Sequence, residues 1–520
     1  MRRIFILLGL GAALPHVLAQ SAPDLLWARR AGGNDSDTGH SIAIDLSGNV
    51  YVAGAFYAMN DFGAVKLTSA GLSDIFIAKY DPDGNFLWAR RAGGTGYDEA
   101  RGIAVDASGN AYVTGLFQLT ANFAPTNLVS AGQSDVFLAK YDPAGNLQWA
   151  RRAGGNDFEE SHAIRIDSST NIYIAGYFDA NANFGSSALH NNSGSSDIFI
   201  AKADPNGNFL WARQAGGNGE DIGDAIALDA AANVYVTGYF ETNAVFETTT
   251  LVAAGTTGLR DMFLASYTSA GNFRWVRQAG GVGEDAGSAV AADDQGNVYV
   301  TGSFTTPATF TSTNLTGSGV DMFLAKYSST GAFAWARRAG GNNAIYGDGG
   351  EGVALDGARN VYVTGFFSGT ANFGTTNLAT TGLDDIFLAK YNPAGTLQWA
   401  RKLGGTDLDV AYAMAIDAAT NICLSGSFYA TATFGSTTFT SFGLDDSIVV
   451  RFGTAPRPYL AAAKSGTNIN LSWPNWATNF WLESADQISN AMNWVQIPVA
   501  TNAIKLPIPG RQKFFRLRKP

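Results

Sequence analysis

The chain has 520 residues, of which 46% are hydrophobic and only 15% are charged, so it is long enough for two or three domains with large cores. Its 61 glycines against 15 prolines favour many tight turns in an ordered protein over disorder. The formal net charge of −10 and the lack of a basic stripe argue against a partner that is nucleic acid or an anionic membrane.

The first residues have the pattern of an export signal. Two arginines precede a short apolar run over residues 4–14, and Val17 and Ala19 provide the small residues of a cleavage site. We therefore expect a signal peptide over residues 1–19 and a secreted, periplasmic or cell-surface protein. No later segment has 18 consecutive apolar residues, so we expect no membrane span.

A tryptophan motif, WARRAGG or a close variant, returns every 60 to 64 residues, and such a period is the signature of a repeat architecture. Each full unit has four short runs rich in β-branched and aromatic residues, separated by turns such as DASGN and DPAGN. No window has helical spacing. Four antiparallel strands joined by such turns make one propeller blade. The tryptophans are Trp27, Trp88, Trp149, Trp211, Trp275, Trp335 and Trp399.

The repeats are offset at the two ends of the array. Seven copies of the first three strands and seven of the fourth exist, but the first copy of the fourth strand, LLWARR at residues 25–30, precedes all the others. It is expected to pair with residues 448–452 and complete the last blade, because a three-stranded last blade would leave an open edge. We predict an all-β chain with a seven-bladed β-propeller over residues 24–453, closed by an N-terminal strand clasp. An open solenoid is the weaker alternative.

The succession D-x-x-G-N-x-Y-V, D-x-F-x-A-K-Y and W-A-R resembles the bacterial SBBP-type β-propeller repeat, which is similar in style to NHL repeats. The resemblance extends over about residues 25–452, and all seven units carry most of the pattern. It implies an exported propeller protein of a family whose activity is mostly undetermined.

The composition changes after Gly453. A short linker, TAPRP, precedes five short apolar runs that predict a small β-sandwich over residues 458–520. This segment resembles a C-terminal module of predicted secreted bacterial proteins. Its tryptophans are expected to serve core and edge packing, with an aromatic platform for carbohydrate as the alternative: Trp473, Trp476, Trp481 and Trp494.

Positions that are the same in every unit should serve what every blade needs, which is folding. The long loop inside each unit has a recurring phenylalanine, from Phe62 to Phe434, that predicts a plug against the blade edge. Cys423 is the only cysteine, so no disulfide forms within the chain, and we expect a buried small hydrophobe. One Arg and two Asp recur in every unit and are interpreted as structural pairs and caps, with calcium binding by the aspartates as the alternative. Examples are Arg151, Asp106 and Asp135.

The connection from one unit to the next carries an acid in each copy: Asp37, Asp98, Glu159, Asp221, Asp285, Asp348 and Asp409. Three residues later the side chain differs between the copies. This loop should deliver the chain to the innermost strand, so we predict a ligand-binding ring at the mouth of the central channel, with the acids as supporting groups. The alternative is a solvated rim that tolerates change. The ring residues are His40, Arg101, His162, Asp224, Ser288, Glu351 and Tyr412.

No catalytic residue is assigned, because the chain lacks G-x-S-x-G, H-E-x-x-H and P-loop motifs. A metal-binding pair of His40 and His162 is a remote alternative. We predict an exported binding or interaction scaffold, monomeric, that presents an acidic loop face to a protein, a glycan or a cation, with no cofactor beyond a possible divalent cation. A glycan-acting hydrolase or lyase with its site at the channel mouth, and a structural cell-surface protein, are the alternatives, because fold alone does not choose between them.

Overall fold

The computed structural model describes residues 22–191, 194–255, 259–305, 307–341 and 347–454 of the repeat region. In the C-terminal part it describes residues 461–465, 468–473, 481–485, 495–498, 503–507 and 514–518. The chain divides into a compact unit, Gln20–Gly453, and a second that includes Thr454–Pro520. The predicted signal peptide and the predicted domain boundaries at residues 19 and 458 lie outside the described residues.

Every regular element in the described part of the chain is a β-strand, which confirms the predicted all-β class. The search of these residues for an apolar helix long enough to cross a membrane found none.

In the unit Gln20–Gly453, the described strands form seven sets of four antiparallel strands, which we number 1 to 7. The first strands are β2 (Asp37–Ile44), β6 (Asp98–Val105), β12 (Glu159–Ile166), β18 (Asp221–Leu228), β24 (Asp285–Ala292), β30 (Gly349–Leu355) and β34 (Asp409–Ile416). The second strands are β3 (Val50–Asp61), β7 (Ala111–Phe117), β13 (Ile172–Phe178), β19 (Val234–Glu241), β25 (Val298–Thr305), β31 (Val361–Asn372) and β35 (Ile422–Phe434).

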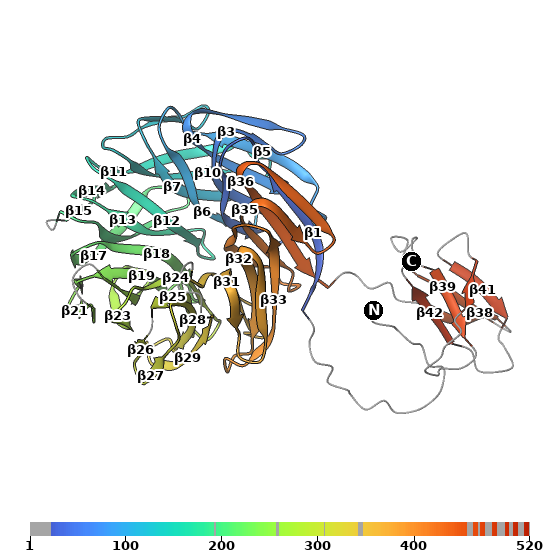
Figure 1. The fold of residues 1–520 in the computed structure, drawn as a ribbon. Helices are drawn as coiled ribbons and strands as arrows, with labels where there is room; N and C mark the ends of the chain where they lie inside the picture. The colour runs from blue at the N-terminus through green and yellow to red at the C-terminus, as the bar shows by residue number, and fades with distance from the viewer. Residues whose placement is uncertain are drawn as a thin grey trace. The chain divides into compact units, whose positions relative to one another are not determined.

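The third strands are β4 (Lys66–Tyr80), β10 (Asp135–Tyr141), β16 (Asp197–Ala203), β22 (Arg260–Tyr267), β28 (Val320–Tyr327), β32 (Asn377–Tyr391) and β36 (Thr437–Gly453). The fourth strands are β5 (Phe86–Ala92), β11 (Leu147–Gly155), β17 (Phe209–Asn218), β23 (Phe273–Gly281), β29 (Phe333–Ala339), β33 (Leu397–Gly405) and, for set 7, β1 (Asp24–Ala31). The sets follow one another in chain order, from blue to orange in Figure 1.

The predicted long loop is itself β-structure. In sets 2 to 5 it forms a separate hairpin, and in sets 1, 6 and 7 the second and third strands simply continue into it. Its recurring phenylalanines are buried; the Phe123 ring lies 5.1 Å from that of Phe137 in the third strand. The hairpin strands are β8 (Thr120–Asn122), β9 (Asn127–Val129), β14 (Asn181–Phe184), β15 (Ser187–His190), β20 (Asn243–Phe246), β21 (Thr249–Val252), β26 (Ala308–Phe310) and β27 (Thr313–Leu315).

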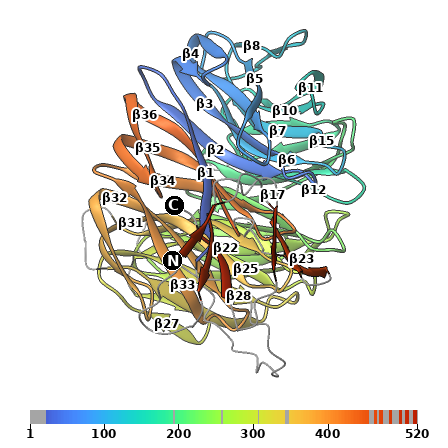
Figure 2. The ribbon, with the colours of Figure 1, turned by 90° about the vertical axis from the view of Figure 1, so that its right-hand side faces the viewer.

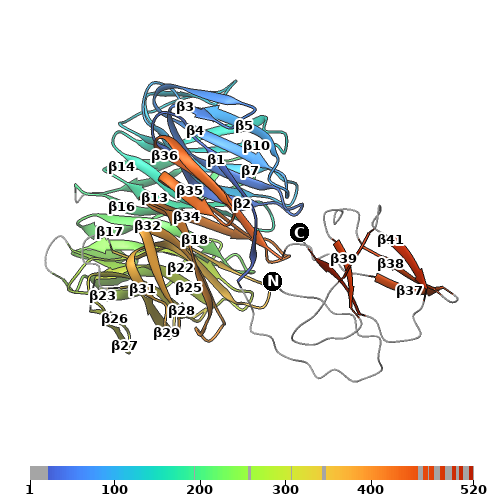
Figure 3. The same ribbon diagram turned by 45° about the vertical axis from the view of Figure 1, so that its right-hand side comes forward.

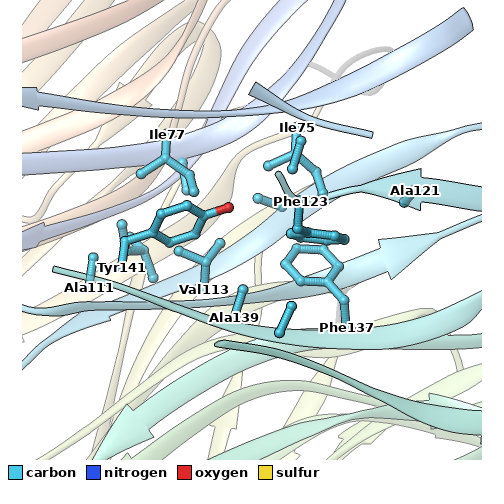
Figure 4. Close-up of a cluster of buried hydrophobic side chains, with 14 of the residues drawn as sticks. Ile75, Ile77, Ala111, Val113, Ala121, Phe123, Phe137, Ala139 and Tyr141 are labelled. Atoms are coloured by element: carbon cyan, nitrogen blue, oxygen red, sulfur yellow. The ribbon is translucent and has the colours of Figure 1, made fainter. Parts of the chain in front are cut away.

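Buried side chains form a cluster between each set and the next. Between sets 1 and 2, Ile75 and Ile77 of β4 pack against Val113 and Tyr141 of the next sheet (Figure 4). The first strands contact one another in the same order, and β34 contacts β2. Each sheet therefore buries both faces against neighbours, which explains the near-continuous apolar strands.

The N-terminal strand pairs with the last strand of the unit. β1 runs antiparallel to β36, with Leu25 opposite Phe452 and Arg30 opposite Ile448. The two strands lie side by side in Figures 2 and 3, blue against orange. The two faces of β1 enter different clusters: Trp27 packs between sets 7 and 1, and Ala28 packs between sets 6 and 7. Cys423 is buried in the cluster of Trp27.

The recurring Trp and Arg of the fourth strand reach the turn of the next set. Trp27 donates a hydrogen bond from Nε1 to the Pro82 carbonyl, at 2.9 Å, and its ring lies where a β-carbon on Gly84 would be. Gly84 also has a φ of 77°, which a side chain disfavours. Arg90 donates from Nε to the Gly145 carbonyl at 2.8 Å. The arginines are thus held by backbone carbonyls and are only partly buried.

The recurring Asp of the first turn is a cap. Asp106 accepts hydrogen bonds from the backbone N–H groups of Ser108 and Asn110 and from the Asn110 amide, each between 2.7 and 2.9 Å. The same pattern surrounds its counterparts, for example Asp417. This aspartate satisfies turn donors that would otherwise lack a partner.

The C-terminal part has two three-stranded antiparallel sheets, β37-β38-β41 and β40-β39-β42. Leu471 of the first sheet and Leu482 and Phe515 of the second belong to one buried cluster that also contains Trp473. Trp481 is exposed, and Trp476 and Trp494 lie outside the described residues. The strands are β37 (Ala461–Ser465), β38 (Asn468–Ser472), β39 (Trp481–Ala485), β40 (Val495–Ile497), β41 (Ala503–Pro507) and β42 (Phe514–Arg518).

Deleting residues 24–30 should strongly destabilise the unit, because it removes β1 from two clusters and leaves β36 with an unpaired edge. We expect a large fall in melting temperature and aggregation in size-exclusion chromatography, whereas Asp24→Ala, an exposed change in the same strand, should leave both unaltered. A monomeric deletion variant with the melting temperature of the intact chain would show that β1 is dispensable.

Arg90→Ala should lower the free energy of unfolding by about 1 kcal/mol, the usual net contribution of hydrogen bonds between partly exposed groups. Arg90 bonds the carbonyls of Gly145 and Ala144 in the next turn. Arg151 occupies the same position, but within the described residues its guanidinium bonds only the carbonyl of its neighbour Ala150, so Arg151→Ala should cost less. Urea unfolding of both variants measures the two losses in free energy of unfolding. If the losses are equal, the bonds from Arg90 to the carbonyls of the next turn do not contribute to stability.

Candidate functional site

The seven predicted ring residues line one cavity of about 480 Å³. Each lies on a first strand, not in the preceding loop that the sequence predicted. In every case it is the extra residue of a β-bulge: the pairing of β2 with β3 skips His40, and that of β34 with β35 skips Tyr412. The same skip occurs at the other five ring residues. A bulged residue has no partner in the ladder, so its side chain can be directed away from the sheet.

A glycine in the second strand makes room for each bulge. A β-carbon on Gly54 would overlap the carbonyl oxygen of Thr38, and one on Gly426 would overlap that of Val410. The same overlap would arise in every set, at Gly115, Gly176, Gly238, Gly302 and Gly365. Glycine is therefore required at these positions because a side chain would clash with the backbone, and not because the backbone has a positive φ.

The acid at the start of each first strand stands three residues before the ring residue and is buried. Asp37, Asp98 and their counterparts accept a hydrogen bond from the backbone N–H of a glycine in the preceding turn, at 2.6 to 2.9 Å. Burial, despite that bond, raises the pKa of Asp37 to about 9 and that of Asp409 to about 8. None of these acids lines the cavity; they fix the entry of the chain into the strand.

A second buried aspartate, from a third strand, lies close to each acid that begins a first strand. A β-carbon on Gly404 would meet both Asp385 and Asp409, so the two carboxyl groups lie close together. The charge of Asp385 adds to burial in raising the pKa of Asp409. Two carboxylates at such a distance cannot both ionise at low cost, so one proton is retained in the pair near neutral pH.

One side of the cavity carries a connected charge network, which we call the network wall: Arg101, Glu160, His162 and Asp224. Arg101 lies 2.8 Å from carboxylate oxygens of both Glu99 and Glu160. His162 contacts Glu160 through Nε2 at 3.4 Å and Asp224 through Nδ1 at 2.9 Å. Every charge in this wall therefore has an opposite charge as its neighbour.

The network wall fixes its own protonation state. Burial alone would lower the pKa of His162, but the bonds to Asp224 and Glu160 raise it to about 9. Burial alone would raise the pKa of Glu160, but His162 and Arg101 lower it to about 2. At neutral pH His162 is thus a cation and Glu160 an anion.

The other side, which we call the open wall, consists of Ser288, Glu351, Tyr412 and His40. Among the described residues, the carboxyl group of Glu351 has no hydrogen bond or ion pair; burial and the charge of Asp224 raise its pKa to about 7. Burial and Arg101 lower the pKa of His40 to about 3, so its imidazole is neutral. The rings of His40 and Tyr412 lie 5.9 Å apart. The open wall offers hydrogen-bond donors and acceptors beside an aromatic surface.

Five further residues of the cavity were not identified from the sequence: Glu160, Tyr177, Glu220, Ile222 and Tyr239. Tyr177 donates to Glu160 at 3.2 Å, directly across the two strands. These positions also differ between the copies, as Thr38 and Ala55 show in set 1. The same test of variation, applied two residues before the bulge and to the residue across the strand pair, would have found Glu160, Tyr177, Ile222 and Tyr239.

His40 and His162 line the same cavity, and a metal-binding pair of the two stays a prediction. The ring of His40 is tilted by 54° to that of Tyr412, and both nitrogens of His162 face carboxylates. In the part of the chain that the structure describes, no group of three or more His, Cys, Asp or Glu side chains is placed to hold a metal ion.

Asp409→Asn should raise stability at alkaline pH. The folded pKa of Asp409, about 8, is above its ordinary 3.8, so the stability that its protonated form provides is complete below about pH 4 and is lost as the pH rises through 8. We expect the melting temperature of the variant to exceed that of the wild type at pH 9 and to match it near pH 4. Asp83→Asn, an exposed control, should change neither. A variant less stable than the wild type at pH 9 would mean that the ionised carboxylate is required.

Comparison with known proteins agrees with the repeat. The SBBP family, described as a β-propeller repeat, matches residues 26–55, 87–116 and 274–303. Each match runs from a fourth strand through the next first strand into the second strand. An uncharacterised WD repeat-containing protein, L264, of Acanthamoeba polyphaga mimivirus is 26% identical over 512 residues, 78% of this chain and 36% of that protein. The regulatory protein FlaEY of Caulobacter vibrioides is 31% identical over 110 residues, 20% of this chain and 12% of its own.

The chain thus spans about a third or less of the length of these two relatives. Among solved structures, a puromycin hydrolase is 10% identical with a TM-score of 0.38, covering 85% of this chain and 59% of its own. YCF48 bound to a peptide is 8% identical with a TM-score of 0.37, covering 84% and 99%. A Dyadobacter fermentans protein of unknown function is 11% identical with a TM-score of 0.37, covering 82% and 99%. From the three matched segments, the chain carries SBBP-type β-propeller repeats.

Proposed function

We propose that the chain is a closed seven-bladed β-propeller with a small C-terminal β-sandwich, exported from the cell, and that it is a scaffold whose central cavity binds a glycan. The pairing of β1 with β36 and the contact of β34 with β2 support closure. The buried cluster shared by the two C-terminal sheets supports a sandwich. The signal-like residues 1–19 support secretion to the periplasm, the cell surface or the medium.

The observation that carries the proposal is convergence. Seven bulged residues from strands up to 372 residues apart, between His40 and Tyr412, meet at one cavity, and their side chains differ in charge, size and hydrogen bonding. If the seven sets carried the same residue at this position, the cavity would present one group seven times and could not match an asymmetric ligand. Groups held on paired strands also lose little entropy on binding.

The two walls favour a glycan over a cation or an ionic protein surface. The charges of the network wall are already matched within the protein, so a charged ligand would have to break those contacts. The open wall retains donors and acceptors on Ser288, Glu351 and His40, next to the Tyr412 ring. The hydroxyl groups of a sugar can bond these donors and acceptors while the sugar ring packs against the aromatic face. The cavity volume of about 480 Å³ is within the range of small-molecule sites.

A glycan-acting hydrolase or lyase is the second candidate, and Glu351 is the observation in its favour. A carboxyl group with a pKa of about 7 can act as a general acid or base near neutral pH, while Asp224 lies near enough to influence it. This role would use the same cavity, so product formation has to be measured as well as binding.

The experiment uses the full-length mature chain and a panel of neutral oligosaccharides, acidic oligosaccharides, envelope fragments and divalent cations, with binding measured by calorimetry. The open-wall variant Ser288→Ala with Tyr412→Phe should weaken binding of a neutral oligosaccharide about tenfold or more, since each lost hydrogen bond contributes about 1 kcal/mol. Folding should persist, because these positions already differ between the sets. Arg359→Ala, in an exposed ion pair elsewhere, is the control.

Equal affinity of the open-wall variant and the wild type would overturn the cavity as the binding site. Turnover of an oligosaccharide by the wild type that is lost in Glu351→Gln, with binding retained, would establish the enzyme instead. If no member of the panel binds, a structural surface protein becomes the better interpretation.

A further inference from the structure

A single arginine breaks the pattern deeper in the ring. Arg165 lies on β12, three residues beyond the bulged residue His162. At the same distance beyond the bulge, the other six first strands carry alanine, whose side chain is buried or half-buried: Ala43, Ala104, Ala227, Ala291, Ala354 and Ala415. Variation between the copies identified the residues of the cavity, so the single replacement of alanine by Arg165 at this position also suggests a specific role.

The position of β12 determines where the side chain points. β12 pairs with β13 on one edge and contacts β6 and β18 of the neighbouring sets. Ile164 is buried and Ile166 half-buried, yet Arg165 is exposed. With neighbours on three sides, an exposed side chain on a first strand emerges toward the axis that the seven first strands surround. At about 3.3 Å per residue, Arg165 lies roughly 10 Å from His162 along the strand, below the cavity.

The guanidinium of Arg165 has no carboxylate beside it. Its hydrogen bond runs from Nη1 to the carbonyl of its own neighbour Ile164, at 2.8 Å, and no ion pair to it forms within the described residues. The other arginine on a first strand, Arg101, contacts two carboxylates. The surrounding protein lowers the pKa of Arg165, and no acid offsets this effect. A partly desolvated charge without a partner costs free energy that an added anion would recover.

We propose that Arg165 is the anchor of an anion-binding site on the axis of the ring, which takes the carboxylate or phosphate group of a small molecule. A guanidinium presents two parallel N–H donors that match either oxyanion. The six equivalent positions carry alanine, so none of them adds a second long or charged side chain at this level of the first strands. The site is separate from the open wall and does not depend on the glycan proposal.

The test is the melting temperature of the full-length mature protein in an uncharged buffer system at fixed low ionic strength, with chloride replaced by inorganic phosphate or by acetate. Wild type should be stabilised by at least one of the two oxyanions, by about 1 °C or more at saturation, and the arm that responds identifies phosphate or carboxylate as the preferred group. Arg165→Ala should lose the response. Calorimetric titration with the same salts should show binding to the wild type and none to the variant.

Two control variants distinguish the Arg165 site from a general charge effect and from the open wall. Arg359→Ala, at an exposed arginine paired with Asp294, should keep the response, which excludes a general effect of charge. Glu351→Gln should also keep it, which excludes the open wall as the place where the oxyanion binds.

Without oxyanion, Arg165→Ala should melt at or above the wild-type temperature, because it removes an unpaired charge and restores the residue of the other six strands. The proposal is overturned if Arg165→Ala responds like the wild type, if the wild type responds to neither salt, or if the variant is destabilised without oxyanion.

Discussion

The pairing of the first strand with the last is the interaction on which the unit Gln20–Gly453 depends. Each set buries both faces of its sheet only because it has a neighbour on either side, and set 7 is complete only when β1 lies against β36. Without β1, Trp27 would leave one core and Ala28 another. The first and last strands of this unit are therefore joined by the same hydrogen bonds and apolar contacts that hold each set together, with no disulfide among the described residues.

Successive sets are also held together by contacts outside the strands. The Trp and Arg of a fourth strand meet the turn of the following set, and Gly84 permits the close approach of Trp27. Set 7 has no such turn between its third and fourth strands, because these strands come from opposite ends of the unit. There Arg401 donates to the Pro23 carbonyl, a residue just before β1, in place of a turn carbonyl. The closing strand thus supplies the missing acceptor as well as the missing edge.

Much of this arrangement follows from the sequence because it repeats. The strand pattern, the offset of LLWARR and the position that differs between copies are all visible without coordinates. The bulges were missed because an extra residue changes the alternation by one, and the small residues around His40 and Tyr412 look like a loop. The hairpin β14–β15 and its equivalents were missed for a similar reason, since strands of three or four residues carry little pattern.

The network wall could not have been predicted from repeats at all. The contacts among Arg101, Glu160, His162 and Asp224 join three different sets and depend on a combination of side chains at positions that differ between the sets. Internal comparison identifies where the copies diverge, but it cannot show that two divergent residues neutralise each other. The carbonyl partners of the recurring arginines were similarly hidden, because backbone acceptors leave no trace in composition.

The glycine opposite each bulge has a consequence for how such a ring can diversify. Because Gly54 and its equivalents absorb the extra residue, the bulged side chain takes no part in the strand ladder, and its identity is released from the demands of folding. The ring residues can then be exchanged without altering the strand ladder, although Arg101, His162 and Asp224 are coupled to one another through their charge network. A library randomised at these seven codons alone would therefore sample new cavity linings while the framework is retained.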